Sequence, residues 1–218
     1  MKTVSSSLIH RILPPERPTA SAHPALIMLH GRGADEEDLL GLAPMLDERL
    51  FIISARAPIP FSSGGGYTWY DVGDAGIPDA ATFNPSYEKL LTFVHDAIRN
   101  YPVDGRRIFL FGFSMGTVMS YAVALSQPGL IRGVAANSGY IPERTVLELK
   151  WHELQNTAFF IIHGTDDQVI PVAFARRARE LFANSNAACD YREYQMGHQI
   201  SEESIAEVSG WIARQIDR

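Results

Sequence analysis

Short, uniformly apolar runs recur along the chain, and stretches with helical spacing separate them. Runs this short and this apolar are typical of strands that are covered on both faces, as in parallel sheets. Five of them are ALIMLHG (25–31), LFIISA (50–55), RIFLFGF (107–113), IRGVAAN (131–137) and AFFIIHG (158–164). The helix-like stretches are 36–47, 86–100, 115–126, 173–184 and 201–217. Strand alternating with helix predicts an α/β fold, with a mostly parallel central sheet and helices on both faces.

Three further segments complete this arrangement. Residues 1–13 are expected to form an antiparallel edge strand, and the alternating residues 188–195 one more strand. Segment 56–85 holds three consecutive glycines, four prolines and several aromatic residues, and we expect it to be a long loop over a functional site. Within it, Trp69 and Tyr70 are the expected substrate contacts. No linker interrupts the 218 residues, so we expect a single domain over 1–218.

Composition excludes several classes of protein. The net charge is −6 and no stripe of lysine or arginine is present, so nucleic acid is not an expected partner. Cys189 is the single cysteine, so no internal disulfide can form. No apolar run is long enough to span a membrane, and the first residues lack the apolar core of a secretory signal. We therefore expect a cytoplasmic protein.

Ser114 lies between two glycines, in GFSMG (112–116), directly after an apolar run and before a helix-like stretch. This strand–turn–helix context is the one that a nucleophile elbow requires. In such a turn the neighbouring chain comes so close that side chains two positions before and after the serine would clash. The alternative is an ordinary turn in which Ser114 caps the helix.

A serine nucleophile needs a base and an acid, and both follow Ser114 in the sequence. His198 lies in a loop after the last expected strand, and Asp166 and Asp167 follow the strand before it. The order Ser, Asp, His is that of α/β-hydrolases. The residues alone leave the choice between Asp166 and Asp167 open. His163, at a strand end, is interpreted as a structural histidine packed beneath the acid loop.

Backbone donors for an oxyanion are expected after the first apolar run. LHGRGAD (29–35) carries glycines that let amides turn toward the site, and the candidates are the amides of Arg32 and Met115. The alternative, a phosphate-binding turn, lacks the third glycine or the Lys-Ser/Thr pair that such turns use. No pair of histidines has metal-ligand spacing and no cluster of cysteines exists, so no metal or cofactor is expected.

With LHGRGAD, ARAPIP, TWYD, GFSMG, HGTDDQVIP and MGHQI in this order, the chain resembles the phospholipase/carboxylesterase family of α/β-hydrolases over nearly its whole length. That family includes acyl-protein thioesterases and small bacterial carboxylesterases. The resemblance implies an α/β-hydrolase fold without a cofactor, with Ser114 as nucleophile, Asp167 as acid and His198 as base, and homodimers as a common state. The chain departs from the family at Met115, where glutamine is frequent, and at Arg32, where a small aliphatic residue is common.

The expected activity is that of a serine carboxylesterase acting on small-molecule esters through an acyl-enzyme. Only residues 138–157 separate the strands between which hydrolases often insert a lid, so we expect no lid domain and a preference for short- to medium-chain esters. A thioesterase, lysophospholipase or peptidase on the same residues is one alternative. A non-catalytic, hydrolase-like binding protein is the other. A dienelactone hydrolase is disfavoured because the elbow carries Ser114 and not cysteine.

Overall fold

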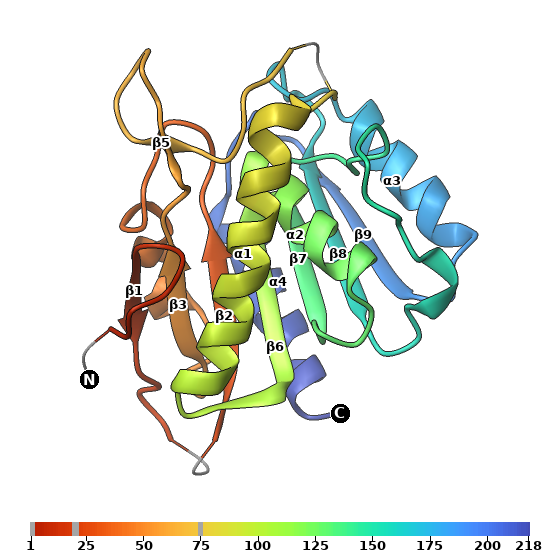
Figure 1. Ribbon diagram of the computed structural model, residues 1–218. Helices are drawn as coiled ribbons and strands as arrows, with labels where there is room; N and C mark the ends of the chain where they lie inside the picture. The colour runs from red at the N-terminus through yellow and green to blue at the C-terminus, as the bar shows by residue number, and fades with distance from the viewer. Residues whose placement is uncertain (1–2, 19–21, 74–75) are drawn as a thin grey trace.

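A seven-stranded sheet forms the centre of the computed structural model, which describes residues 3–18, 22–73 and 76–218. Its strand order is β1-β3-β2-β6-β7-β8-β9. Only β1 is antiparallel to its neighbour, and every other pair is parallel, as the sequence predicts (Figure 1). The strands are β1 (His10–Leu13), β2 (His23–Leu29), β3 (Phe51–Ala55), β6 (Val103–Phe113), β7 (Gly133–Asn137), β8 (Ala158–Gly164) and β9 (Ala188–Tyr194).

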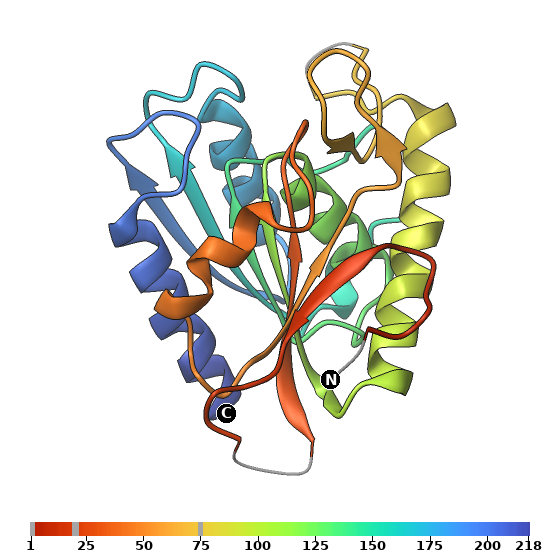
Figure 2. The same ribbon diagram turned by 90° about the vertical axis from the view of Figure 1, so that its left-hand side faces the viewer.

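Helices cover both faces of this sheet, and each face has its own hydrophobic core. One core joins α1 (Ala80–Asn100), α2 (Met115–Ser126) and α3 (Ala173–Ala183) to the sheet. The other joins α4 (Glu202–Ile216) and the 3₁₀ helix η1 (Asp38–Met45) to the opposite face. Figure 2 shows the twisted sheet between these two layers. A short 3₁₀ helix, η2 (Trp151–Glu153), lies between β7 and β8.

The long helix α1 begins earlier than the sequence predicts, at Ala80 instead of residue 86. Asp79 caps it by accepting a hydrogen bond from the amide of Thr82 at 3.0 Å. Pro85 lies inside the helix and removes one backbone hydrogen bond, a loss that burial of one whole face offsets. That face consists of buried residues three or four positions apart, Phe83, Tyr87, Leu90, Val94 and Ala97.

Two other segments differ from expectation. The expected helix 36–47 is the 3₁₀ helix η1, which contains Pro44. The expected loop 56–85 contains a small hairpin of β4 (Ile59–Pro60) and β5 (Tyr67–Thr68) before α1 begins. In both segments proline or glycine interrupts the hydrophobic periodicity. The periodicity therefore did not predict the type of helix in the first segment or the hairpin in the second.

The carboxyl ends of the parallel strands converge at one edge of the sheet, the upper edge in Figure 1. The loops that follow β2, β6, β7, β8 and β9 therefore meet there, as is usual for the functional site of an α/β sheet. None of the described helices combines the length and apolar character needed to cross a membrane.

Candidate active site

Ser114 occupies a strained turn between β6 and α2. Its φ is 56° and its ψ −118°, a conformation that is uncommon for residues other than glycine. The backbone is held there because the Ser114 amide donates to the carbonyl of Asn137 at the end of β7, at 3.0 Å. Among the described residues no hydrogen bond caps α2 from the Ser114 hydroxyl, so the ordinary N-cap interpretation is wrong. The hydroxyl is left available for chemistry.

The two glycines around Ser114 are required by close packing. A Cβ atom on Gly112 would lie 2.5 Å from the Cα of Thr117, at the start of α2. A Cβ on Gly116 would overlap the carbonyl oxygen of Leu29 in β2. Side chains at these two positions would therefore force the strand and helix apart and open the turn. The steric reason for this glycine spacing, inferred from the sequence, is confirmed.

Asp167 and His198 are joined by a hydrogen bond. The Nδ1 atom of His198 lies 2.7 Å from Oδ2 of Asp167, whose side chain is fully buried. The other carboxylate oxygen accepts the amides of Val169 and Ile170 at 2.9 and 2.8 Å. Burial alone would raise the pKa of Asp167, but the hydrogen bonds from His198 and these two amides lower it below its ordinary value. The carboxylate is therefore ionised at neutral pH and holds a proton on Nδ1 of His198.

The neighbouring acidic and histidine candidates take other roles. Asp166 is exposed, and its backbone amide bonds to the carbonyl of Met196 at 3.1 Å. His163 is buried beneath the acid loop, where its Nε2 lies 2.7 Å from the carbonyl oxygen of Ile170 and 3.3 Å from Asp167. Burial lowers the pKa of His163, so it is a neutral, structural residue. Of the two aspartates, only Asp167 bonds to His198 within the described part of the chain.

Ser114 and His198 face the same cavity. The imidazole of His198 packs against the ring of Phe113, with a centroid separation of 4.9 Å. Within the described ranges the Ser114 hydroxyl forms no hydrogen bond with His198. Catalytic hydrogen bonds often tighten only when substrate binds, so the absence of this bond does not exclude proton transfer between the two residues.

The loop after β2 brings Arg32 to the cavity, and buried His30 anchors that loop. The Nδ1 of His30 lies 2.6 Å from the carbonyl oxygen of Gly31, and its Nε2 accepts the amide of Ala57 at 3.0 Å. Burial lowers the pKa of His30, which keeps the ring neutral and able to accept this bond. The guanidinium of Arg32 lies over the ring of Phe61 at 4.7 Å.

Two amides near Ser114 remain free for an oxyanion. Met115 is the first residue of α2, where helix geometry leaves N–H groups unpaired and the helix dipole favours negative charge. Across the described ranges the amide of Arg32 likewise has no protein acceptor. Both residues line the cavity with Ser114, so both sequence candidates lie at the site.

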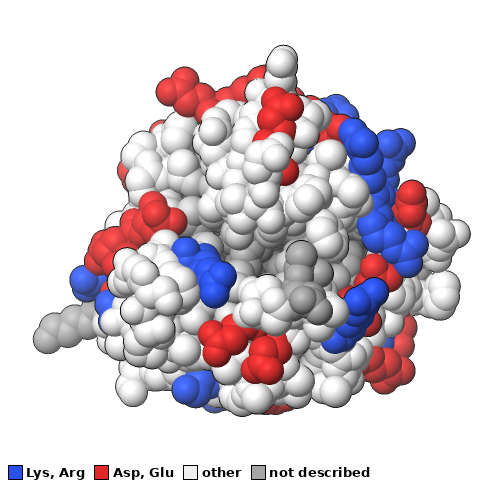
Figure 3. Space-filling model, turned by 90° about the horizontal axis from the view of Figure 1, so that it is seen from above, with Lys and Arg blue, Asp and Glu red and all other residues white. Residues whose placement is uncertain are grey.

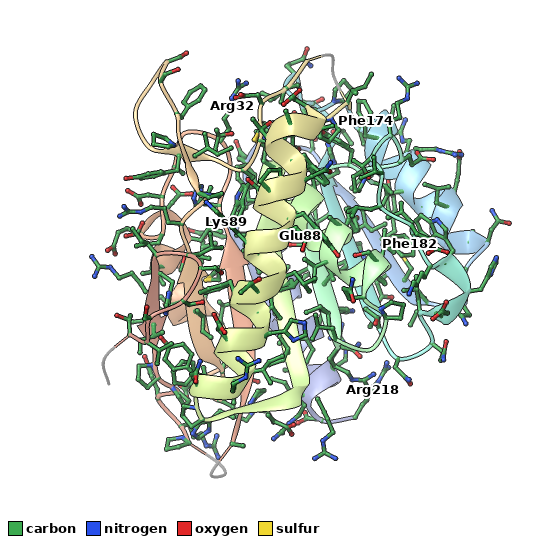
Figure 4. The ribbon with its side chains drawn as sticks, viewed as in Figure 1. Arg32, Glu88, Lys89, Phe174, Phe182 and Arg218 are labelled. Carbon is green, nitrogen blue, oxygen red and sulfur yellow. The ribbon has the colours of Figure 1, made fainter. Side chains whose placement is uncertain are left out.

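The cavity encloses about 600 Å³ at the upper end of the molecule. Figure 3 shows a central hollow on this face, with a largely uncharged surround and most of the basic side chains on one flank. Figure 4 places Arg32 and Phe174 at this same end of the molecule. The lining is mostly apolar and comes from several loops, with Gly31, Arg32, Ala34, Asp38, Tyr70, Val72, Gly76, Phe113, Ser114, Met115, Tyr140, Val169, Ile170, Phe174 and His198.

The two aromatic residues predicted to contact substrate have different positions. Tyr70 lines the cavity, and its contact with substrate stays a prediction. Trp69 is completely buried and is not among the lining residues, so the expectation for Trp69 is wrong. Its indole N–H instead donates to the carbonyl of His30 at 2.9 Å. Trp69 thus supports the Arg32 loop from beneath.

Segment 56–85 forms only one wall of the cavity, through Tyr70, Val72 and Gly76. The other walls come from residues that the sequence did not single out, chiefly Phe113, Tyr140 and Phe174. Tyr140 was detectable in principle, since it follows β7 at the carboxyl edge of the sheet. Phe174 had no such signal, because it belongs to a helix. In the part of the chain that the structure describes, no three His, Cys, Asp or Glu side chains are grouped to hold a metal.

Comparisons with known proteins identify the family of the chain. The model of the Phospholipase/Carboxylesterase family matches residues 11–216. An acyl-protein thioesterase 1 of Debaryomyces hansenii is 28% identical, with 93% of this chain and 97% of the relative covered. A probable carboxylesterase of Oryza sativa subsp. japonica is 26% identical, with 95% and 84% covered.

Solved structures share the fold. The carboxylesterase of Bacillus cereus superimposes with a TM-score of 0.84 at 23% identity, covering 95% of this chain and 94% of that one. A carboxylesterase from Mesorhizobium loti gives 0.83 at 22% identity, covering 97% of each chain. Because the family model spans almost the entire chain, this protein belongs to the phospholipase/carboxylesterase family of α/β-hydrolases.

Proposed function

We propose that the protein is a serine carboxylesterase that hydrolyses small carboxylic esters through an acyl-enzyme. The observation that carries the proposal is the hydrogen bond between buried Asp167 and His198, at 2.7 Å, beside the cavity that holds Ser114. A carboxylate in this position orients an imidazole as a base. Membership of the family supports the same assignment.

In the proposed reaction Ser114 attacks the ester carbonyl, and Nε2 of His198 takes the hydroxyl proton. Asp167 holds the imidazole in the required tautomer and stabilises the imidazolium, while remaining ionised. The protonated His198 then gives its proton to the departing alcohol, which leaves Ser114 acylated. Water attacks the acyl-enzyme with His198 again as base, and Ser114 is regenerated.

The negative charge that develops on the carbonyl oxygen is assigned to two backbone donors, the amides of Arg32 and Met115. The argument is positional: both amides belong to residues that line the cavity with Ser114, and one of them begins α2. Donors that are already aimed at the oxyanion stabilise the transition state without reorganising.

Replacing the nucleophile tests the mechanism. Ser114→Ala should fold normally and lose ester hydrolysis by several orders of magnitude, because only binding and the oxyanion donors remain. A fluorophosphonate should add to the wild-type protein once, and peptide mass spectrometry should locate the adduct on Ser114. An adduct on another residue, or an alanine variant that remains active, contradicts the proposal. Absence of both labelling and hydrolysis favours the binding-protein alternative.

A thioesterase activity is the second candidate, because relatives of this chain are named acyl-protein thioesterases. The test is a panel of p-nitrophenyl esters and matched acyl thioesters of increasing chain length. We expect the highest kcat/KM on short to medium acyl esters, because the described part of the chain contains no lid domain over the cavity. No jump in activity should accompany formation of an oil–water interface. Preference for thioesters, or for long-chain emulsions, would reverse the assignment.

Three properties of the whole protein complete the proposal: one domain over 1–218, a cytoplasmic location and the capacity to form a homodimer. The central seven-stranded sheet, to which strands from both ends of the chain belong, supports the first property, and the family resemblance supports the last. Calorimetry should show one unfolding transition, cell fractionation should recover the protein with cytoplasmic markers, and sedimentation equilibrium should give twice the chain mass. A second transition, a membrane-bound pool or a monomer at micromolar concentration would contradict the respective property.

A further inference from the structure

Two tyrosine hydroxyl groups meet in the wall of the Ser114 cavity. The Oη atoms of Tyr70 and Tyr140 lie 3.0 Å apart, and both residues line the cavity. Tyr70 is completely buried and Tyr140 is 6% exposed. Tyr70 follows β5 and Tyr140 follows β7, so two separate loops bring the pair together.

The surroundings hold both rings firmly. Tyr70 packs edge-on against Phe83 of α1, with centroids 5.4 Å apart. Tyr140 packs against Phe174 of α3 at 5.5 Å. Burial raises the pKa of both tyrosines, so both carry their protons at neutral pH. The pair is therefore a rigid and neutral polar group in a mostly apolar wall.

Counting protons shows that this polar group is incomplete. Two phenols supply two O–H donors, and the bond between them uses one. Among the described residues, no acceptor takes the second proton of the Tyr70–Tyr140 pair. Both tyrosines line the Ser114 cavity, so the second proton is directed at the cavity, where solvent can accept it in the free protein. An oxygen atom of a bound substrate that displaces this water must accept the same proton, because a hydroxyl buried without an acceptor is unfavourable.

We propose that Tyr70 and Tyr140 form a specificity-determining donor site for an oxygen atom of the substrate other than those of the scissile ester. The substrate class is then an ester that carries a second oxygen function, such as an ether, carbonyl or hydroxyl, and not a plain alkyl ester. The donor is neutral, and Arg32 and Asp38, of opposite charge, both line the cavity, so the pair itself selects for an acceptor oxygen and not for a charge. This inference rests on the proposed esterase function.

Matched substrates test it. One is p-nitrophenyl hexanoate, and the others carry one ether oxygen in place of the β, γ or δ methylene of the acyl chain. For each enzyme, kcat/KM on the ether ester is divided by kcat/KM on hexanoate. The wild-type ratio divided by the Tyr140→Phe ratio is the double ratio. The intrinsic reactivity of each ester cancels in it, so it reports only the effect of the Tyr140 hydroxyl. The Tyr70→Phe variant provides a second, independent comparison.

At one of the three positions we expect this double ratio to be about fivefold, the worth of one hydrogen bond between neutral groups. The control is Tyr87→Phe, which removes a buried hydroxyl bonded to Ser126 at 2.8 Å, away from the cavity, and should give a double ratio of one. A double ratio of one at every position for both Tyr140→Phe and Tyr70→Phe overturns the inference, and the pair is then structural. If the wild-type protein did not hydrolyse p-nitrophenyl hexanoate at all, the proposed esterase function itself would be overturned.

Discussion

At the scale of single residues, Ser114 combines a strained backbone with the proposed role of nucleophile. A serine with a positive φ is unfavourable by itself, and it persists only where the surrounding structure determines it. Here the bond to Asn137 and the close approach of β2 to Gly116 provide that constraint. The result is a hydroxyl that is directed out of the sheet at the start of α2.

The two adjacent aspartates give the sharpest residue-scale prediction. In Asp167→Asn the side-chain oxygen can still accept the amides of Val169 and Ile170, so the loop should remain folded. The amide nitrogen then faces His198, which favours the wrong imidazole tautomer, and kcat should fall on the order of 10⁴-fold. Steady-state kinetics on a short ester provide the measurement.

Asp166→Asn is the matched control for that substitution. Asp166 is exposed, and its backbone amide donates to the carbonyl of Met196 in the loop after β9, so kcat should change far less. If the Asp166 variant were the more damaged of the two, the acid would have been assigned to the wrong residue.

At the scale of elements, the loop after β2 is the proposed source of one oxyanion donor, the backbone amide of Arg32. His30 and Trp69 hold this loop from below, and the guanidinium of Arg32 lies over the ring of Phe61. We therefore expect the loop to present the Arg32 amide whatever side chain that residue carries. The proposed oxyanion role needs only this N–H group in a fixed position.

Two substitutions at this position separate the amide from the side chain. Arg32→Ala keeps the N–H and should retain most of kcat on a neutral short ester. Arg32→Pro removes the N–H, and the loss of one oxyanion donor typically lowers kcat by about 10²–10³-fold. Circular dichroism and a melting curve should first establish that the proline variant is folded. Equal damage from alanine and proline would mean that the guanidinium itself binds substrate.

At the scale of the whole molecule, buried titratable groups make stability depend on pH. Burial lowers the pKa of His30 and His163 from 6.5, so below pH 6.5 the unfolded chain binds more protons than the folded one. Stability should therefore decrease as the pH falls through 6.5. A second decrease should begin below 4.5, because hydrogen bonds from Arg176 and Tyr191 lower the pKa of Glu193 from 4.5 to about 2.

Melting temperatures measured from about pH 8 down to about pH 3 check this prediction. His163→Gln keeps a side-chain N–H for the carbonyl of Ile170 but does not titrate. Its melting temperature should thus decrease less than that of the wild type between about pH 7 and about pH 5. An identical decrease in the two proteins would remove His163 as a source of the effect.

The sequence by itself determined the features that depend on near neighbours in the chain. Apolar runs alternating with helical periodicity predicted the parallel sheet and its two helical layers, because burial on both faces leaves a local pattern. The elbow at Ser114 was equally predictable, because positions 112 and 116 leave no room for a side chain and both are glycine in the sequence. Prolines hid the true start of α1 and the 3₁₀ form of η1, where the local pattern is interrupted.

Tertiary structure alone decided what depends on contacts between distant segments. The sequence pattern left open whether Asp166 or Asp167 pairs with the histidine. Only the approach of the His198 loop distinguishes the buried carboxylate of Asp167 from the exposed one of Asp166. Trp69 and Tyr70 are adjacent, yet one lies beneath the Arg32 loop and the other faces the cavity. Tyr140 meets Tyr70 because β7 lies beside β6 in the sheet and brings its following loop to the same edge. A chain's local pattern records which residues are buried, whereas their partners are set by how the strands are ordered in space.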